Sequence, residues 1–367
     1  MTAGAEADTE RDGSGSEGST DAVGEVVTAL ATIPRWWRPA ALSVYAVALV
    51  VWIVEAGMPK DPFVMFAILW LASVAWYAGH PWRQHAQFFK DWWPAFAALV
   101  LYMYSRGLSD ELIGMPVHWV MPIEVDRWMF GGHLPTEVLQ ERLCGDPCRS
   151  ASDPRWFDLV FTSVYNTHFV LGLGLALVLY LRNRREWISW LTRYVAINVT
   201  GLVVYVFYPM APPWLAAQEG YLDPVARLTG RGWRDIGLGG FHHALAAVGN
   251  PVAAMPSLHA GVAMLVTIYA VSRLRGRRWR WVLMLYPLTM AFALVYYGEH
   301  YVIDAIAGWA LALVVHVGVT LWERRYFARH PVTTRSGALL SLPPPGLGDP
   351  TGTAGTADEL PGPVRRG

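Results

Sequence analysis

The stretch "YYGEHYVIDAIAGWALALVVHVGVTLW", residues 296–322, joins a polar beginning to a long apolar run. Residues 301–322 are long and apolar enough to cross roughly 30 Å of hydrocarbon as a helix. His300 and Asp304 stand at the start of this run, four residues apart, so they share one face of the helix. Ionisable groups at a membrane span are candidates for function by default, although many only pair helices together.

The rest of the chain is similarly apolar. Of its 367 residues, 54% are hydrophobic, 16% are charged and 19 are Trp, which is too apolar for a soluble globule. We therefore expect an all-α integral membrane protein, a polytopic helical bundle. The formal net charge is zero and gives no indication of a nucleic-acid partner. Nearly all basic residues are Arg, which favours a GC-rich, bacterial coding sequence.

Eight apolar stretches are long enough to form membrane-spanning helices. The third is interrupted at its end by the polar letters "RGLSDEL", and only a tight turn separates the last two. We expect the eight helices near residues 40–57, 62–79, 94–112, 157–181, 187–208, 257–274, 281–298 and 301–322.

Arginine clusters indicate how these helices are oriented. The clusters "PRWWRP" before the first helix, "LRNRREW" after the fourth, "RLRGRRWR" after the sixth and "ERRYFARH" after the eighth fall on one side when the helices alternate. Because positively charged loops stay in the cytoplasm, we expect that side and both termini to be cytoplasmic. The two long loops, residues 113–156 and 209–256, then lie on the external face of the cell membrane.

The two ends of the chain differ from its centre in composition. Residues 1–34 are acidic, rich in Gly and Ser, and unlike a signal peptide, so we expect a disordered cytoplasmic tail. Residues 326–367 are rich in Pro, Gly and Thr and predict a second disordered tail.

Cys144 and Cys148 lie in the turn "RLCGDPCRS", within a loop that we expect outside the cytoplasm. An oxidising compartment and the short Gly-Asp-Pro spacer favour a disulfide between them over free thiols. Zinc is less well supported, because two thiols leave a tetrahedral site half filled and no further Cys or His pair follows at a matching spacing.

Three segments at the outer ends of the expected helices carry polar groups suited to chemistry. "YPMAPPW" (208–214) closes the fifth helix, "MPSLHA" (255–260) opens the sixth, and the segment 296–309 turns from the seventh into the eighth. His259 stands at a helix start, where free backbone amides and the helix dipole attract anions. A phosphate there would meet those amides, the hydroxyl of Ser257 and two imidazoles.

These residues resemble a known family. "PSLH", followed some forty residues later by "GEHYVIDAIAG", is similar to the second and third signature motifs of the type 2 phosphatidic acid phosphatase superfamily. "YPMAPPW" in front resembles the branch of the inositol phosphorylceramide synthases. The family fold is a six-helix bundle, which corresponds here to residues 90–325 and leaves residues 35–89 as two accessory transmembrane helices.

The resemblance implies a role for each residue of these motifs. His300 would be the nucleophile that forms a phosphohistidine, Asp304 would orient it, and His259 would protonate the leaving oxygen. Ser257 would help to hold the phosphate. This chemistry needs no metal or other cofactor, and the sequence has no cluster of carboxylates that predicts one.

Two cations of the hydrolase branch are missing from this chain. A lysine followed seven residues later by Arg-Pro is absent, because Ala67 and Ala97 stand at that spacing after the two lysines. The Ser-Arg pair upstream of the nucleophile is replaced by Ala293 and Leu294. Arg106, in "YMYSRGLSD", is our substitute candidate for binding phosphate, and the alternative is an interfacial arginine that snorkels.

Further polar residues stand near the expected site. Asn166 and His168, in "VYNTHF", either line the cavity and bind substrate or form a hydrogen-bonded pair that braces helices. Asp126 and Glu299 are polar candidates near the outer face without a definite role.

The sequence therefore predicts an enzyme that transfers a phosphate-containing head group from a membrane lipid to a hydroxyl acceptor at the external leaflet. A phosphatase of lipid or polyprenyl phosphates is the alternative within the same chemistry, because water then attacks in place of an alcohol. A lipid-phosphate binding or transport protein without catalysis is the alternative from another class. The donor, the acceptor and the oligomeric state are not readable from the sequence.

Overall fold

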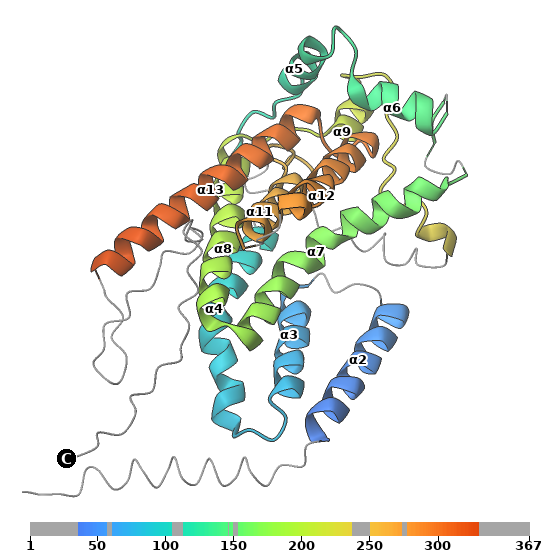
Figure 1. Ribbon diagram of the computed structural model, residues 1–367. Coiled ribbons are helices and arrows are strands. Elements are labelled where there is room, and N and C mark those ends of the chain that lie inside the picture. Colours follow the sequence, from blue (N-terminus) through green and yellow to red (C-terminus); the bar gives the residue numbers. More distant parts are fainter. Residues whose placement is uncertain are drawn as a thin grey trace, which may run out of the picture.

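The computed structural model describes residues 36–56, 61–104, 113–145, 147–149, 153–236, 250–273 and 277–329, and this part of the chain is helical and has no β-strand (Figure 1). The expected all-α bundle is therefore confirmed. Its elements are α2 (Trp37–Ala56), α3 (Pro62–Trp76), α4 (Trp82–Tyr104), α5 (Met121–Met129), α6 (Pro135–Leu143), α7 (Trp156–Arg182), α8 (Arg184–Phe207), α9 (Pro213–Gln218), the 3₁₀ turn η2 (Arg234–Ile236), α11 (Leu258–Arg273), α12 (Arg277–Tyr296) and α13 (Val302–Arg329).

Each of the eight expected apolar segments coincides with a helix, namely α2, α3, α4, α7, α8, α11, α12 and α13. The third differs most, because α4 begins at Trp82 instead of residue 94 and includes Pro94 in its interior. Its first half gathers apolar side chains on one face, so a search for continuous apolar runs passes over it. The boundary that we expected at residues 89 and 90 falls inside α4, and the expected end at residue 112 lies outside the described residues.

Four of the described helices, α2, α7, α8 and α13, are long and apolar enough to cross a membrane. Helices α3, α11 and α12 are also apolar but contain shorter apolar segments. A helical chain with several such segments is a multi-pass membrane protein.

Helix α11 is the centre of the bundle. It packs against α13, α12, α8 and α7, whereas α2, α3 and α4 form a row beside them in which α3 contacts α7 and α4 contacts α8 (Figure 1). Buried aromatic residues of α8 and α11 fill the space between the helices, including Trp190, Tyr194 and Tyr269. The first turns of α11 and α13 therefore lie inside the bundle and not on its rim.

Small residues let α11 and α13 approach closely. The backbone N–H of Ser257 donates to the carbonyl of Asp304 at 3.0 Å, which ties the start of one helix to the first turn of the other. A Cβ atom on Gly308 would collide with the carbonyl oxygen of Ser257. Glycine at this position is thus required by the close contact of two helices, as is common between membrane helices.

A layer of short helices, which we call the external layer because it lies outside the bundle of long helices, covers one end of the bundle (Figure 1). Its helix α6 packs on α12, and its helix α5 packs on α13. Gln140 of α6 is buried and donates to the carbonyl oxygens of Ala226 and Tyr296 at 2.7 and 3.0 Å. The layer is therefore held on the membrane helices by specific polar contacts.

The structure joins Cys144 and Cys148 by a disulfide at the end of α6. Arg231, which is buried, donates to the sulfur of Cys144 at 2.9 Å and pairs with Asp158 of α7 at 3.3 Å. The guanidinium thus connects the disulfide turn to the first turn of a membrane helix.

Candidate active site

His300 and Asp304 meet at the start of α13. Nδ1 of His300 lies 3.4 Å from Oδ2 of Asp304, at the long end of hydrogen-bond distances. The same carboxylate oxygen accepts the backbone N–H of Tyr301 at 2.9 Å, so it also caps the helix. Both side chains are buried, and Asp304 is fully so. A carboxylate bound to Nδ1 favours the tautomer whose Nε2 carries a free electron pair.

Ser257 begins α11 and fixes its first turn. Its Oγ accepts the backbone N–H of Ala260 at 3.3 Å, and its carbonyl accepts the N–H of Gly261 at 2.9 Å. A hydroxyl that accepts in a cap still has its own hydrogen to donate. Ser257 is fully buried, so its hydroxyl hydrogen can be donated only to a group inside the bundle.

His259 lies near His300, with ring centroids 6.0 Å apart. The ring of His259 lies in a stack, because Tyr165 is 4.7 Å from it and His168 is 4.0 Å from it, centroid to centroid. Phe169 contacts its edge at 5.6 Å. The stack fixes the plane of the imidazole and directs its polar edge.

Asn166 and His168 come from α7. His168 lies directly on His259, while Asn166 is buried two residues earlier, on a nearly opposite side of the helix. Among the described residues, neither the Oδ1 of Asn166 nor the Nδ1 of His168 has a hydrogen-bond partner, although both atoms are buried. Both of our alternatives for the two residues, substrate binding and the bracing of helices, stay predictions.

Two atoms of the central residues are also unsatisfied. Nε2 of His259 and Oδ1 of Asp304 are buried and have no hydrogen-bond partner in the part of the chain that the structure describes. Buried polar atoms are nearly always paired, so a group of unpaired ones marks a site that exchanges protons or binds a polar ligand.

The three outer segments expected to converge do so. The N–H of Met210 donates to Val252 at 2.8 Å, and the N–H of Trp214 donates to Gly298 at 3.1 Å. "YPMAPPW" therefore bridges the approach to α11 and the turn before α13. Tyr205 of α8 adds a contact that the sequence did not suggest, because its hydroxyl donates to the carbonyl of Pro256 at 2.7 Å.

The structure contains an ion pair that we did not predict from the sequence. Arg227 donates from Nε to the carboxylate of Glu299 at 2.5 Å, and Thr229 donates to the same carboxylate at 3.2 Å. The guanidinium carbon of Arg227 lies 4.5 Å from the ring centre of Trp214. Arg227 belongs to no sequence motif. Its relation to the site is seen only in the structure, where it binds Glu299, the residue that precedes His300.

Asp126 was noted in the sequence without a role, and the structure places it against the same helix start. Its carboxylate accepts the backbone N–H groups of Val302 and Ile303 at 2.8 and 3.0 Å. Our substitute phosphate-binding candidate, Arg106, lies outside the described residues.

Among the described residues, no group of three or more His, Cys, Asp or Glu side chains is arranged to hold a metal ion.

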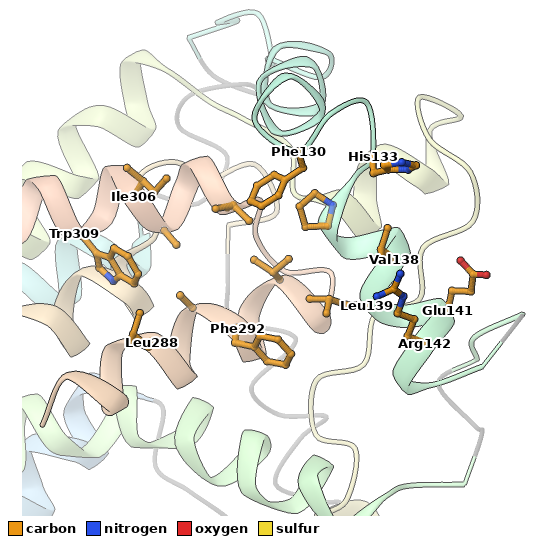
Figure 2. Close-up of a pocket in the computed structure, with 15 residues that line it drawn as sticks. Phe130, His133, Val138, Leu139, Glu141, Arg142, Leu288, Phe292, Ile306 and Trp309 are labelled. Carbon is orange, nitrogen blue, oxygen red and sulfur yellow. The ribbon is translucent and has the colours of Figure 1, made fainter. Parts of the chain in front are cut away.

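A separate groove lies between the external layer and the outer halves of α12 and α13 (Figure 2). It encloses about 690 Å³ and is lined mainly by apolar side chains, among them Leu288, Phe292 and Trp309. His259 and His300 do not line it. The groove is therefore distinct from the histidine site, although Val302 of α13 borders it.

Comparison with known proteins agrees with this geometry. Residues 147–318 match the model of the PAP2 superfamily. This match confirms the resemblance to the type 2 phosphatidic acid phosphatase superfamily that the motifs indicated.

Two relatives support the branch of the inositol phosphorylceramide synthases. Phosphoinositol dihydroceramide synthase of Bacteroides thetaiotaomicron is 26% identical over 253 residues, which are 59% of this chain and 80% of the relative. The inositol phosphorylceramide synthase catalytic subunit aur1 of Schizosaccharomyces pombe is 28% identical over 139 residues, which are 35% of this chain and 31% of the relative. No solved structure matches the chain significantly.

Proposed function

We propose that this protein is a membrane phosphotransferase that moves a phosphate-containing head group from one lipid to a hydroxyl acceptor through a phosphohistidine. The observation that carries the proposal is the pairing of His300 with Asp304 beside a second histidine, whose buried Nε2 has no partner among the described residues. Both synthase relatives support transfer of an inositol phosphate group.

In the first step, Nε2 of His300 attacks the phosphorus of the donor lipid. An N–P bond forms and the P–O bond to the lipid alcohol breaks. The departing alkoxide takes a proton from His259, while the carboxylate of Asp304 stabilises the positive charge that develops on His300.

In the second step, the hydroxyl of the acceptor attacks the phosphohistidine. His259, now without its proton, accepts the hydroxyl proton as the new P–O bond forms and the N–P bond breaks. His300 is regenerated, and one histidine serves as acid and then as base.

The phosphate charge is met by groups of the two helix starts. Ser257 donates its hydroxyl, and the amides of the first turn of α11 provide positive potential. Asn166 and His168 contact the substrate from α7 with the buried polar atoms that lack a protein partner. Arg106 remains our proposed additional cation, and Arg227 is a second candidate beside Glu299.

The arginine clusters support an orientation with both termini in the cytoplasm and the histidine site at the external leaflet of a bacterial cell membrane. The partners of the enzyme are then membrane lipids, including the lipid phosphate that it consumes. Labelling of single cysteines in intact cells tests this orientation, because a cysteine in place of Glu219 should react with an impermeant reagent and one in place of Arg185 should not.

The mechanism needs no metal ion, because imidazole, carboxylate and helix amides supply the acid, base and electrostatic roles. Purified protein treated with a chelator should keep its rate of turnover. Loss of activity that only a divalent metal restores would contradict this part of the proposal.

Purified protein given labelled inositol phospholipid with and without a ceramide-type acceptor tests the choice between transfer and hydrolysis. Transfer predicts a new lipid product that depends on the acceptor, whereas release of free phosphate or phosphoinositol alone would establish the phosphatase alternative. Tight lipid binding with neither product would favour the non-catalytic alternative.

A further inference from the structure

The first turn of α13 is held by two carboxylates from different parts of the chain. The N–H of Tyr301 donates to Asp304, and the N–H groups of Val302 and Ile303 donate to Asp126. Three successive amides at a helix start normally lack partners within the helix. Here each has one, so the backbone that carries the nucleophile is fully constrained.

Asp126 belongs to the external helix α5, in a segment that precedes the matched family region 147–318. Its side chain is completely buried. Around it, Ile123 and Leu134 pack with Tyr301 in a single apolar cluster. The aspartate is therefore placed by the external layer and directed at the residues that directly follow His300.

We propose that Asp126 is a positioning residue that holds the first turn of α13, and with it His300, in the geometry needed for attack on phosphorus. The inference rests on the proposed function. Asp304 sets the tautomer of His300, whereas Asp126 sets the backbone from which both side chains project. A misplacement of about 1 Å in a reacting group costs roughly a hundredfold in rate.

The electrostatics agree with this geometry. Burial raises the pKa of Asp126 to about 6, with a further rise from the charge of Asp304, while the two amide hydrogen bonds act in the opposite direction. The other titratable groups at this helix start are His300, Tyr301 and Asp304, and Arg127 and Glu137 pair with each other at 3.7 Å. Protonation of Asp126 near pH 6 would remove the charge that binds the two amides.

The direction in which pH changes the stability of the protein follows from the raised pKa of Asp126. An ordinary aspartate has a pKa of 3.8, so between about pH 4 and pH 6 the folded protein binds this proton more tightly than the unfolded chain does. The contribution of Asp126 to the free energy of unfolding therefore rises as the pH falls through this window. Activity should fall in the same window, which separates positioning from stability.

The test compares Asp126→Ala and Asp126→Asn with Glu124→Ala, an exposed acidic neighbour on the same helix. Asp126→Ala should lower kcat about tenfold to a hundredfold with little change in KM, and Asp126→Asn should recover part of kcat because its amide oxygen still accepts. The parent protein should lose activity below about pH 6, and Asp126→Asn should reduce this acid limb without abolishing it, because attack still requires an unprotonated Nε2 on His300. Glu124→Ala should match the parent throughout.

Three results would overturn the inference: an unchanged kcat in folded Asp126→Ala, an acid limb that persists unaltered in Asp126→Asn, or a loss in both variants explained entirely by the unfolded fraction. Thermal unfolding of each variant measures that fraction. Failure of the proposed function gives a different result, because then either the parent protein shows no turnover or His300→Ala keeps the parental turnover, whatever happens at Asp126.

A second and independent observation concerns the groove of Figure 2. Its inner part is formed by α12 and α13, where Leu288, Phe292 and Ile306 are 48%, 40% and 40% exposed on apolar helices. Its outer rim carries the polar side chains of Arg142 and Glu141 on α6. About seven residues separate Val302 from Trp309, so the groove extends roughly 10 Å along α13.

We infer that this groove holds one hydrocarbon chain of a membrane phospholipid, with the lipid phosphate beside Arg142. An amphipathic ligand fits the change from an apolar inner end to a charged outer rim, and the volume is typical of ligand pockets. Arg142 has no carboxylate partner among the described residues and is exposed. The lipid would occupy a site separate from the histidines.

Photochemical cross-linking tests this inference in the His300→Ala background, where turnover has no influence. Phe292 is replaced with p-benzoylphenylalanine, and Leu313, equally apolar and 55% exposed on α13, receives the same replacement as the control. Illumination of protein purified in detergent should add the mass of one phospholipid at position 292 and not at 313. Arg142→Gln should reduce the yield severalfold.

An absence of lipid adduct at position 292, an adduct of detergent alone, or equal yields at both positions would overturn the inference.

Discussion

The two ends of α13 hold buried charges in opposite ways. Near its outer end, Asp304 and the nearby His259 each keep a buried polar atom without a partner among the described residues. Near its other end, about 28 Å along the helix, Glu323 binds both Nη groups of Arg193 at 2.9 Å. Ser189 and Thr320 accept from the same guanidinium.

The difference shows how a membrane protein separates reactivity from stability. The Arg193 and Glu323 pair is bidentate and both Nη groups have further acceptors, although Nε of Arg193 has no partner among the described residues, so the pair joins α8 to α13 as a structural contact. The histidine cluster contains buried polar atoms that have no hydrogen-bond partner among the described residues. Such atoms cost free energy of folding unless a substrate forms hydrogen bonds with them. Mutations at the two ends should therefore affect different properties.

The largest effect is expected at the nucleophile. His300→Ala should abolish turnover and labelling of the protein by phosphate, because it removes the imidazole that is oriented by Asp304 to form the N–P bond. Asp304→Asn should lower kcat by roughly four powers of ten through loss of tautomer control. Turnover and acid-labile phosphate on the protein are the two measurements.

Both variants should keep the thermal stability of the parent within a few degrees, because His300 and Asp304 lie at the end of α13 that we expect to serve the reaction and not the stability of the fold. If His300→Ala and Asp304→Asn both turned over at the parental rate, the cluster would be structural and the lipid-binding alternative would replace catalysis.

His259→Ala should show a defect that depends on the leaving group. A lipid alkoxide needs a proton, so turnover of the natural class of donor should be severely impaired. A nitrophenyl phosphate needs little protonation, so the variant should recover much of its rate and accumulate phosphohistidine. The parent protein must first be shown to hydrolyse the artificial ester. Equal losses on both donors, together with an active His300→Ala, would mean that the two roles are reversed.

Substitutions at the end of α13 that carries Glu323 should lower the stability of the protein and leave its rate of turnover nearly unchanged. Glu323→Gln leaves the buried guanidinium of Arg193 without a countercharge, which typically costs about 3–5 kcal/mol. Thermal unfolding in detergent should shift down, while kcat per folded molecule stays near the parental value. The double variant Arg193→Met with Glu323→Leu is the control and should recover much of the stability, since it removes both charges together.

The smallest effect is expected at the disulfide. Cys144 and Cys148 close a loop of only a few residues, so the entropic gain is at the low end, at most about 2 kcal/mol. Replacement of both with Ser should lower stability slightly and leave turnover nearly unchanged. Intact mass after alkylation without reductant should show both thiols of the parent blocked, and rapid alkylation of both would refute the pairing.

Sequence patterns predicted the long apolar helices well, because a membrane span must satisfy its backbone internally and be apolar throughout. They predicted α4 poorly, because Trp82 to Trp93 form an amphipathic helix without a continuous apolar run. The pair of His300 and Asp304 was predictable because four residues make one helical turn, and a distance along the chain then becomes a distance in space.

Contacts between segments that lie far apart in the chain could not be predicted from these sequence patterns. Arg227 and Glu299 stand 72 positions apart in the chain, with α11 and α12 between them, so nothing in their spacing indicates an ion pair. The same holds for Asp126, which reaches the amides of Val302 and Ile303 across an unrelated part of the chain.

The sequence by itself determined the membrane helices, the pairing of His300 with Asp304 and the residue types at the site, since these depend on local periodicity and hydropathy. Only the tertiary structure decided which side chains of other segments complete that site. Asp126 bonded to the start of α13, His168 stacked on His259 and Gly308 against Ser257 all depend on how the helices pack. Packing brings together residues far apart in the chain, and no local pattern encodes those distances.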